Sequence, residues 1–150
     1  MRKALKRAKE ILQQCNLSSA PINIDKIIER EGLSLDDWQF AGRIKEAYLG
    51  DSIGIKNTVN PRKRRELIAH ALGHHFLHAG NHLYFEQHDQ FITFKQEHEA
   101  QCFAAELLIP TLLLEPLKDL LIYELADYFS VDEDLVKFRL EILRKEHKWQ

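Results

Sequence analysis

One histidine-rich helix constrains this chain more than any other feature of its sequence. Residues 60–80 read NPRKRRELIAHALGHHFLHAG and contain four of the eight histidines. His70 and His74 are four residues apart, so on a helix their side chains lie about 40° apart around the axis and one turn apart along it. Two imidazoles in this arrangement can bind one zinc ion. The spacing therefore predicts a metal-binding helix.

The residue after His70 separates metal binding from catalysis. The zinc-peptidase motif is H-E-x-x-H, whereas this chain reads H-A-L-G-H, with Ala71 in place of the glutamate. That glutamate takes a proton from the attacking water and passes it to the leaving amine, which a methyl group cannot do. Ala71 is expected to project beside the histidine pair, off the apolar face of the helix. Glu66, one turn earlier, is the only nearby carboxylate of this helix, and it should lie beside His70 rather than replace the base.

Three other positions of the same helix carry separate expectations. His75 borders the apolar face and is expected to be a packed histidine, whereas the helical pattern leaves open whether His78 lies near the metal. Gly73 costs about 1 kcal/mol relative to alanine in a helix interior. A glycine there allows another segment to approach closely.

A third metal ligand must come from elsewhere, and a second helix offers two carboxylates. This helix is expected to begin at Thr93 and to end before Pro110. Glu97 shares its face with small residues such as Ala104, which would allow close packing against the histidine helix, whereas Glu99 points the other way. This geometry favours Glu97 as the ligand and places Glu99 in solvent. Glu99 is the less favoured candidate for the ligand.

Composition limits the remaining possibilities. At 150 residues and 45% hydrophobic, the chain is expected to form a single domain over residues 1–150. Its 21 basic and 23 acidic residues give a net charge of −2, which provides no global attraction to nucleic acid or to an acidic membrane. Cys15 and Cys102 are expected to be buried free thiols in a reducing compartment. No apolar run approaches the length of a membrane span, so the protein is expected to be cytoplasmic.

Alternating apolar residues between positions 33 and 56 predict a small β-sheet. We expect three antiparallel strands, at residues 33–40, 44–49 and 52–56, with Gly50 and Asp51 forming a hairpin turn. The expected fold class is therefore α+β, in which this sheet packs against the histidine helix and further helices surround them.

Two helical patterns in residues 117–143 have the layout of a helix-turn-helix. The first turn of the second helix contains Asp132, Glu133 and Asp134, which would repel phosphates. We therefore expect this pair to complete the core, with no direct contact to nucleic acid. Direct DNA binding through this pair is the weakest of the alternatives.

Two segments of the chain resemble the signature motifs of the ImmA/IrrE family of zinc metallopeptidases. They are residues 65–78, RELIAHALGHHFLH, and residues 97–110, EHEAQCFAAELLIP. The chain departs from the family pattern at Ala71 and at Gln101, where the family usually has asparagine or aspartate. The resemblance implies a zincin-like α+β fold and one Zn²⁺ per chain. By the same resemblance, the zinc ligands would be His70, His74 and Glu97.

The resemblance also implies a function, namely cleavage of a helix-turn-helix transcriptional repressor, often that of a prophage or mobile element. We expect the substrate to add as a strand along residues 52–56, through Ser52, Ile53, Gly54 and Ile55. Loss of a general base typically lowers a rate by about 10² to 10⁴, so the chain is expected to bind its substrate and hardly cut it. The alternative is a non-catalytic, zinc-stabilised module that sequesters the repressor.

Overall fold

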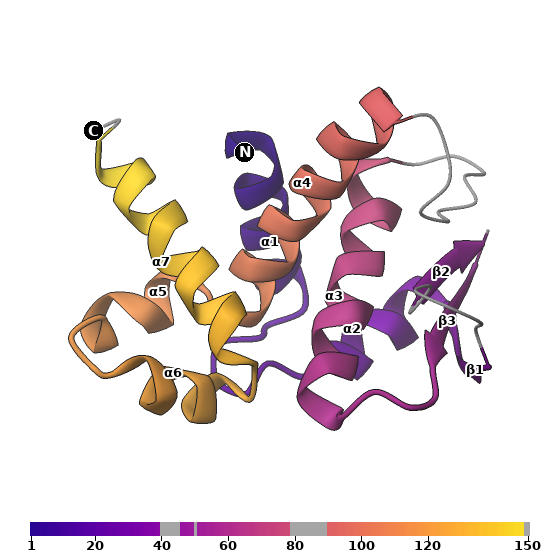
Figure 1. Ribbon diagram of the computed structural model, residues 1–150, viewed down its shortest axis with the longest axis horizontal. Helices are drawn as coiled ribbons and strands as arrows, with labels where there is room; N and C mark the ends of the chain where they lie inside the picture. The colour runs from indigo at the N-terminus through magenta and orange to yellow at the C-terminus, as the bar shows by residue number, and fades with distance from the viewer. Residues whose placement is uncertain (40–45, 50, 79–89, 149–150) are drawn as a thin grey trace.

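The computed structural model describes residues 1–39, 46–49, 51–78 and 90–148, and it combines helices with one small sheet (Figure 1). The helices in chain order are α1 (Arg2–Gln14), α2 (Ile24–Glu31), α3 (Pro61–Leu77), α4 (Gln90–Leu108), α5 (Thr111–Leu114), the 3₁₀ helix η1 (Glu115–Leu117), α6 (Ile122–Phe129) and α7 (Glu133–Lys148). The strands are β1 (Ser34–Trp38), β2 (Glu46–Leu49) and β3 (Ser52–Lys56). The structure thus confirms a mixed α and β composition, with helices predominating.

The sheet contains the three strands in the order β1-β3-β2. β2 and β3 form the predicted antiparallel hairpin, since Leu49 pairs with Ser52 across residues 50 and 51. The prediction that all three strands are antiparallel is wrong, because β1 runs parallel to β3. Alternation of apolar residues identifies a strand but carries no information about the direction of its neighbour.

β3 is the central strand, which contradicts the expectation that a substrate adds along it. Its backbone pairs with β1 on one side and with β2 on the other, so it has no free edge. Ile53 and Ile55 are fully buried in the hydrophobic core. The opposite face at Gly54 is covered by Trp38, whose ring would lie 2.6 Å from a Cβ placed on residue 54. The proposed substrate contacts of Ser52, Ile53, Gly54 and Ile55 are therefore not supported.

Local signals fix the beginning of α3 and both ends of α2. The side chain of Asn23 accepts a hydrogen bond from the backbone N–H of Lys26, and Gly32 ends α2 with a φ of 66°. Asn60 accepts a hydrogen bond from the backbone N–H of Lys63, at 2.9 Å, and Pro61 occupies the first turn of α3. These caps place the histidine motif within a continuous helix.

Helix α3 lies between the sheet and helix α4, and α1 and α7 pack against α4 (Figure 1). Gly73 makes the contact between α3 and α4 close, because a Cβ on residue 73 would lie 2.9 Å from both the Cα and the carbonyl oxygen of Ala100. The close approach that a glycine allows at this position is therefore realised.

The predicted start of α4 at Thr93 is wrong, since the helix begins at Gln90, but its end before Pro110 is as predicted.

The C-terminal helices complete the core, as expected. They contribute Leu125, Phe129, Val136 and other buried side chains to the same hydrophobic cluster as the rest of the chain. An ion pair lies where α7 meets α4, between Arg139 and Glu106, at 3.3 Å, with both side chains fully buried. Arg139 also donates to the carbonyl oxygen of Ile109 and to the hydroxyl of Thr111.

Both cysteines, Cys15 and Cys102, are buried free thiols, as predicted. Within the described ranges, no single helix is both long and apolar enough to cross a membrane. Segments Phe94–Leu108 and Thr111–Leu117 reach that length and composition only as a pair bent by 52°.

Candidate metal centre

Three side chains from two helices meet beside the sheet. The Nε2 atom of His74 lies 2.7 Å from one carboxylate oxygen of Glu97, and the Nε2 atom of His70 lies 3.0 Å from the other. The two imidazole rings are 4.8 Å apart between centroids. α3 supplies both histidines because they are one turn apart, and α4 supplies Glu97 because Gly73 lets the two helices pack closely.

The donor set fits a zinc ion. One ligand atom from each of His70, His74 and Glu97 can be chosen so that all three lie within 4.8 Å of one another. Zinc bonds of about 2.0 to 2.2 Å at tetrahedral angles place ligand atoms roughly 3.3 to 3.6 Å apart, so the three groups are near enough to share one ion. Two imidazoles, one carboxylate and an open fourth position are the ligand set of catalytic zinc sites such as His₂Glu.

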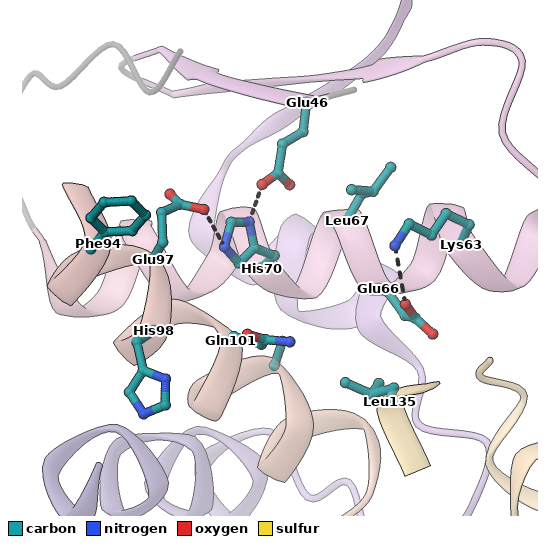
Figure 2. Close-up of a pocket in the computed structure, with 11 residues that line it drawn as sticks. Glu46, Lys63, Glu66, Leu67, His70, Phe94, Glu97, His98, Gln101 and Leu135 are labelled. Atoms are coloured by element: carbon teal, nitrogen blue, oxygen red, sulfur yellow. Dashed lines mark hydrogen bonds and ion pairs between the residues drawn. The ribbon is translucent and has the colours of Figure 1, made fainter. Parts of the chain in front are cut away.

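A carboxylate that the sequence did not indicate supports His70 from the sheet. Glu46 of β2 forms a hydrogen bond with the Nδ1 atom of His70, and Glu97 lies on the other side of the ring (Figure 2). Burial lowers the pKa of His70, but the two carboxylates outweigh that effect and raise it to about 10. Conversely, burial raises the pKa of Glu97, but its interactions with His70 and His74 prevail and hold it well below its usual value.

His74 is also held by neighbouring side chains, since it contacts His78, which in turn contacts Glu99. The Nδ1 atom of His74 lies 3.1 Å from the Nδ1 atom of His78, and the Nε2 atom of His78 lies 3.1 Å from a carboxylate oxygen of Glu99. Burial lowers the pKa of His78, although Glu99 partly opposes that shift. His78 therefore lies next to the candidate ligands, and the expectation that Glu99 points into solvent is wrong.

His75 lies apart from this cluster. Its Nε2 atom is 2.9 Å from a carboxylate oxygen of Glu31 at the end of α2, and its ring contacts Phe76. This agrees with the prediction of a packed histidine.

Ala71 is 1% exposed and belongs to the hydrophobic core, so the expectation that it projects off the apolar face is wrong. α3 contacts β2 and β3 as well as α4, α1 and α2, so its buried surface is wider than a single amphipathic stripe. The spacing of residues along one helix carries no information about how many neighbours surround that helix.

A pocket of about 450 Å³ opens beside His70 and Glu97 (Figure 2). Its other lining residues include Gln101, which departs from the family pattern, and Glu66. Glu66 accepts a hydrogen bond from the backbone N–H of Asp132, at 2.8 Å, and lies 3.7 Å from the Nζ atom of Lys63. It therefore anchors the chain at the start of α7 and lines the same pocket as His70. The full lining comprises Glu46, Lys63, Glu66, Leu67, His70, Phe94, Glu97, His98, Gln101, Ala104 and Leu135.

Sequence reasoning missed Glu46 and Glu99 as partners of the histidines, and it left His78 undecided. His78 offered a usable signal, since it follows His74 by four residues, the same spacing that pairs His74 with His70. Glu46 offered none, because its position depends on how the hairpin packs on α3. The sequence also predicts an irregular loop over the site at residues 79–92, of which residues 79–89 lie outside the described residues and residues 90–92 belong to α4.

One known family model matches most of this chain. The family model Peptidase_M78, described as the IrrE N-terminal-like domain, matches residues 33–141. That range includes both helices of the candidate metal centre and the whole sheet. A search of curated proteins found no match.

Among solved structures, a Mycobacterium tuberculosis transcriptional regulator has a similar fold, with a TM-score of 0.64 at 16% sequence identity. The match covers 93% of this chain but only 46% of the regulator, so the chain spans less than half of that protein's length. Because the family model covers well over half of the chain, this protein belongs to the Peptidase_M78 family, through an IrrE N-terminal-like domain.

Proposed function

We propose that this chain is a zinc-dependent endopeptidase domain that acts on a helix-turn-helix transcriptional repressor, and that Ala71 leaves it severely impaired in cleavage. The observation that carries the proposal is the convergence of His70, His74 and Glu97 beside a pocket, in a chain that belongs to a peptidase family. The likeness to a transcriptional regulator is consistent with a role in gene regulation.

The metal would be held by these three side chains. Bound zinc would supply a Lewis acid that polarises a peptide carbonyl and lowers the pKa of a water molecule. Glu46 would hold the ring of His70 through its Nδ1 atom, so that Nε2 stays directed at the metal. The pocket beside His70 would accommodate a substrate side chain next to the bond to be cut.

An edge strand of the sheet would orient the substrate. Because β3 is the central strand, β2 takes its place as the candidate substrate-binding strand. Within the described residues β2 pairs only with β3, so its outer edge is available to an extended peptide. Glu46 at the start of β2 contacts His70, so this edge begins at the candidate metal centre. A peptide added to β2 would therefore pass directly over that centre.

The catalytic step that lacks a suitable residue is the transfer of a proton from the attacking water. Glu46 is engaged with His70, and Glu66 is held by Asp132 and Lys63, so neither is free to act in place of the missing glutamate. This observation favours a second candidate function, a module that binds a repressor and sequesters it without cutting. In that case release of the repressor from DNA requires stoichiometric amounts of the protein.

Cleavage assays with two matched variants test the proposal. Purified zinc-loaded protein is incubated with a panel of purified helix-turn-helix repressors, and new chain ends are identified by mass spectrometry. We expect Ala71→Glu to raise the cleavage rate by about 10² to 10⁴ over the unaltered chain. Ala71→Gln introduces a side chain of the same size as glutamate, but an amide cannot take up the proton of the attacking water. The Ala71→Gln variant should therefore remain inactive.

Because residue 71 is buried, circular dichroism and zinc content must show that both variants are folded and loaded. If a folded, zinc-loaded Ala71→Glu variant binds a repressor and leaves it intact, the peptidase proposal is wrong. Displacement of that repressor from DNA at a one-to-one ratio would then support sequestration.

A further inference from the structure

His78 stands at the end of α3, one turn beyond His74, and joins that histidine to α4. One ring nitrogen of His78 faces His74 and the other faces Glu99, each at 3.1 Å. The side chains of His74 and His78 are 1% and 7% exposed, and that of Glu99 is 23% exposed. The chain of contacts thus runs from the interior of the candidate metal centre to a partly exposed carboxylate.

The hydrogen bonds from His74 through His78 to Glu99 can all point in one direction, with each residue donating to the next. His74 directs Nε2 at Glu97, where a metal would lie, so its hydrogen must be on Nδ1 when Nε2 acts as a ligand. That N–H can donate to the Nδ1 atom of a neutral His78, whose own hydrogen is then on Nε2. The Nε2–H of His78 in turn donates to Glu99, a carboxylate that can only accept.

We propose that His78 and Glu99 are positioning residues that hold His74 in the tautomer and ring orientation required to bind the metal. The inference rests on the proposed zinc site and extends it to two residues outside the set of candidate ligands. Carboxylates and carbonyl groups commonly hold the distal nitrogen of metal-binding histidines, and loss of such a partner typically lowers metal affinity by about 10- to 100-fold. Here a second imidazole is interposed between the ligand and the carboxylate.

The same helix, α4, provides both the candidate ligand Glu97 and the supporting carboxylate Glu99. These residues are two apart and therefore point to different sides of the helix. Both reach α3 because Ala100, adjacent to Glu99, packs against the backbone of Gly73. His78 spans the additional distance from Glu99 to His74, which explains why a histidine rather than a short side chain stands at this position.

The two candidate histidine ligands are supported from opposite sides. Glu46 of β2 contacts the Nδ1 atom of His70 directly, whereas Glu99 reaches the Nδ1 atom of His74 through His78. The support of His70 thus comes from the sheet, and the support of His74 comes from α4 through His78 at the end of α3.

Zinc affinity, measured by competition with a chromophoric chelator, tests the proposal without any activity assay. His78→Leu removes both hydrogen-bonding groups, and we expect zinc to bind about 10- to 100-fold more weakly. His78→Gln retains an amide oxygen that can accept from His74 and an amide nitrogen that can donate to Glu99, so it should restore most of the affinity. Glu99→Ala removes only the terminal acceptor and should weaken binding by about tenfold.

His75→Leu is the matched control. It removes a histidine of the same helix that also pairs with a glutamate, Glu31 of α2, and whose ring contacts Phe76. Its zinc affinity should equal that of the parent. The visible absorption of the cobalt-substituted proteins provides a second readout, because a misplaced His74 changes the coordination geometry and hence the spectrum.

The results distinguish failure of this inference from failure of the proposed function. If the parent protein binds zinc and folded His78→Leu and Glu99→Ala variants bind it equally well, the positioning role is wrong while the zinc site stands. If the parent binds no zinc, the metal site is wrong and the positioning role with it. Should His78→Leu fail to fold, Glu99→Ala decides the question, since it removes the terminal hydrogen-bond acceptor without introducing an apolar side chain beside His74.

Discussion

Gly73 of α3 packs directly against the backbone of Ala100 of α4, with no room for a side chain on residue 73. The contact matters because α3 carries His70 and His74, and α4 carries Glu97. The distance between the two helices therefore determines whether three candidate ligands from two segments can share one metal ion.

Gly73→Ala should destabilise the protein and weaken zinc binding together. Alanine gains about 1 kcal/mol in helix propensity over glycine, but the added methyl group would meet the Cα and carbonyl oxygen of Ala100 at 2.9 Å. Overpacking of this kind typically costs about 1–3 kcal/mol, so we expect a net loss of up to about 2 kcal/mol, measured by urea denaturation of the metal-free protein. A variant as stable as the parent would contradict the tight contact.

Adding Ala100→Gly to that variant should restore little stability. The nearest atoms to the new methyl group belong to the backbone of residue 100, and removal of a side chain does not move them. Full recovery in the double variant would show that side-chain contact, rather than backbone proximity, limits residue 73.

Zinc should stabilise the folded protein, and His74→Ala should abolish the effect. A ligand at 100 times its dissociation constant contributes about 2.7 kcal/mol to folding if it binds only the native state. We therefore expect zinc to raise the melting temperature of the parent and a chelator to reverse the increase. Metal analysis should find about one zinc per parent chain and none in His74→Ala, and equal zinc content in both would contradict the assignment of this ligand.

The metal-free protein should lose stability as the pH rises from about 6.5 to about 10. The pKa of His70 is raised from 6.5 to about 10 in the folded state, mainly by Glu46 and Glu97 acting against burial. A group with a raised folded pKa contributes its full stability below its unfolded pKa and loses it as the pH passes through the folded value. Denaturation of metal-free protein at several pH values measures this directly.

Two comparisons isolate His70 in that measurement. Glu46→Gln removes one of the two carboxylates that raise the folded pKa of His70, so the loss of stability should be smaller and should be complete at a lower pH than in the parent. Zinc-bound protein should show the opposite trend, because the metal competes with the proton of His70 and gains affinity as the pH rises. A metal-free protein whose stability is flat across this range would contradict the charged state of His70.

Glu106→Leu should destabilise the protein by up to about 3–5 kcal/mol, because it removes the fully buried carboxylate partner of Arg139 and leaves the guanidinium with Glu146, which is 3.5 Å away and 20% exposed. The double variant Glu106→Leu with Arg139→Met should be clearly more stable than Glu106→Leu alone, since apolar side chains of similar volume can replace a buried ion pair at little cost. Urea denaturation of all four proteins of this cycle gives the coupling energy, and additive effects would contradict a direct interaction.

Local features of the sequence predicted the individual helices well. Asn60 and Pro61 mark the start of α3 because a capping side chain and a restrained φ act within a few residues of each other. The spacing of His70 and His74 places both on one side of α3 for the same reason, since the geometry of one helical turn relates them. Small residues around Glu97 also indicated the correct face of α4.

Features that depend on the packing of distant segments were predicted poorly. The direction of β1 and the central position of β3 follow from how the chain crosses the sheet, and no strand records that path in its own residues. Ala71 is buried because several elements surround α3. Each of these outcomes depends on contacts between residues that are far apart in the chain.

The amino-acid sequence by itself thus determined the candidate ligands His70 and His74, the helix that they share, and the absence of a glutamate at position 71. All three are properties of a single helical turn. The meeting of these donors with Glu97, and the support of their rings by Glu46 and by His78 with Glu99, arise only when the hairpin and α4 pack on α3. Side-chain hydrogen bonds act over about 3 Å, so they depend on the final positions of whole elements, which no local pattern encodes.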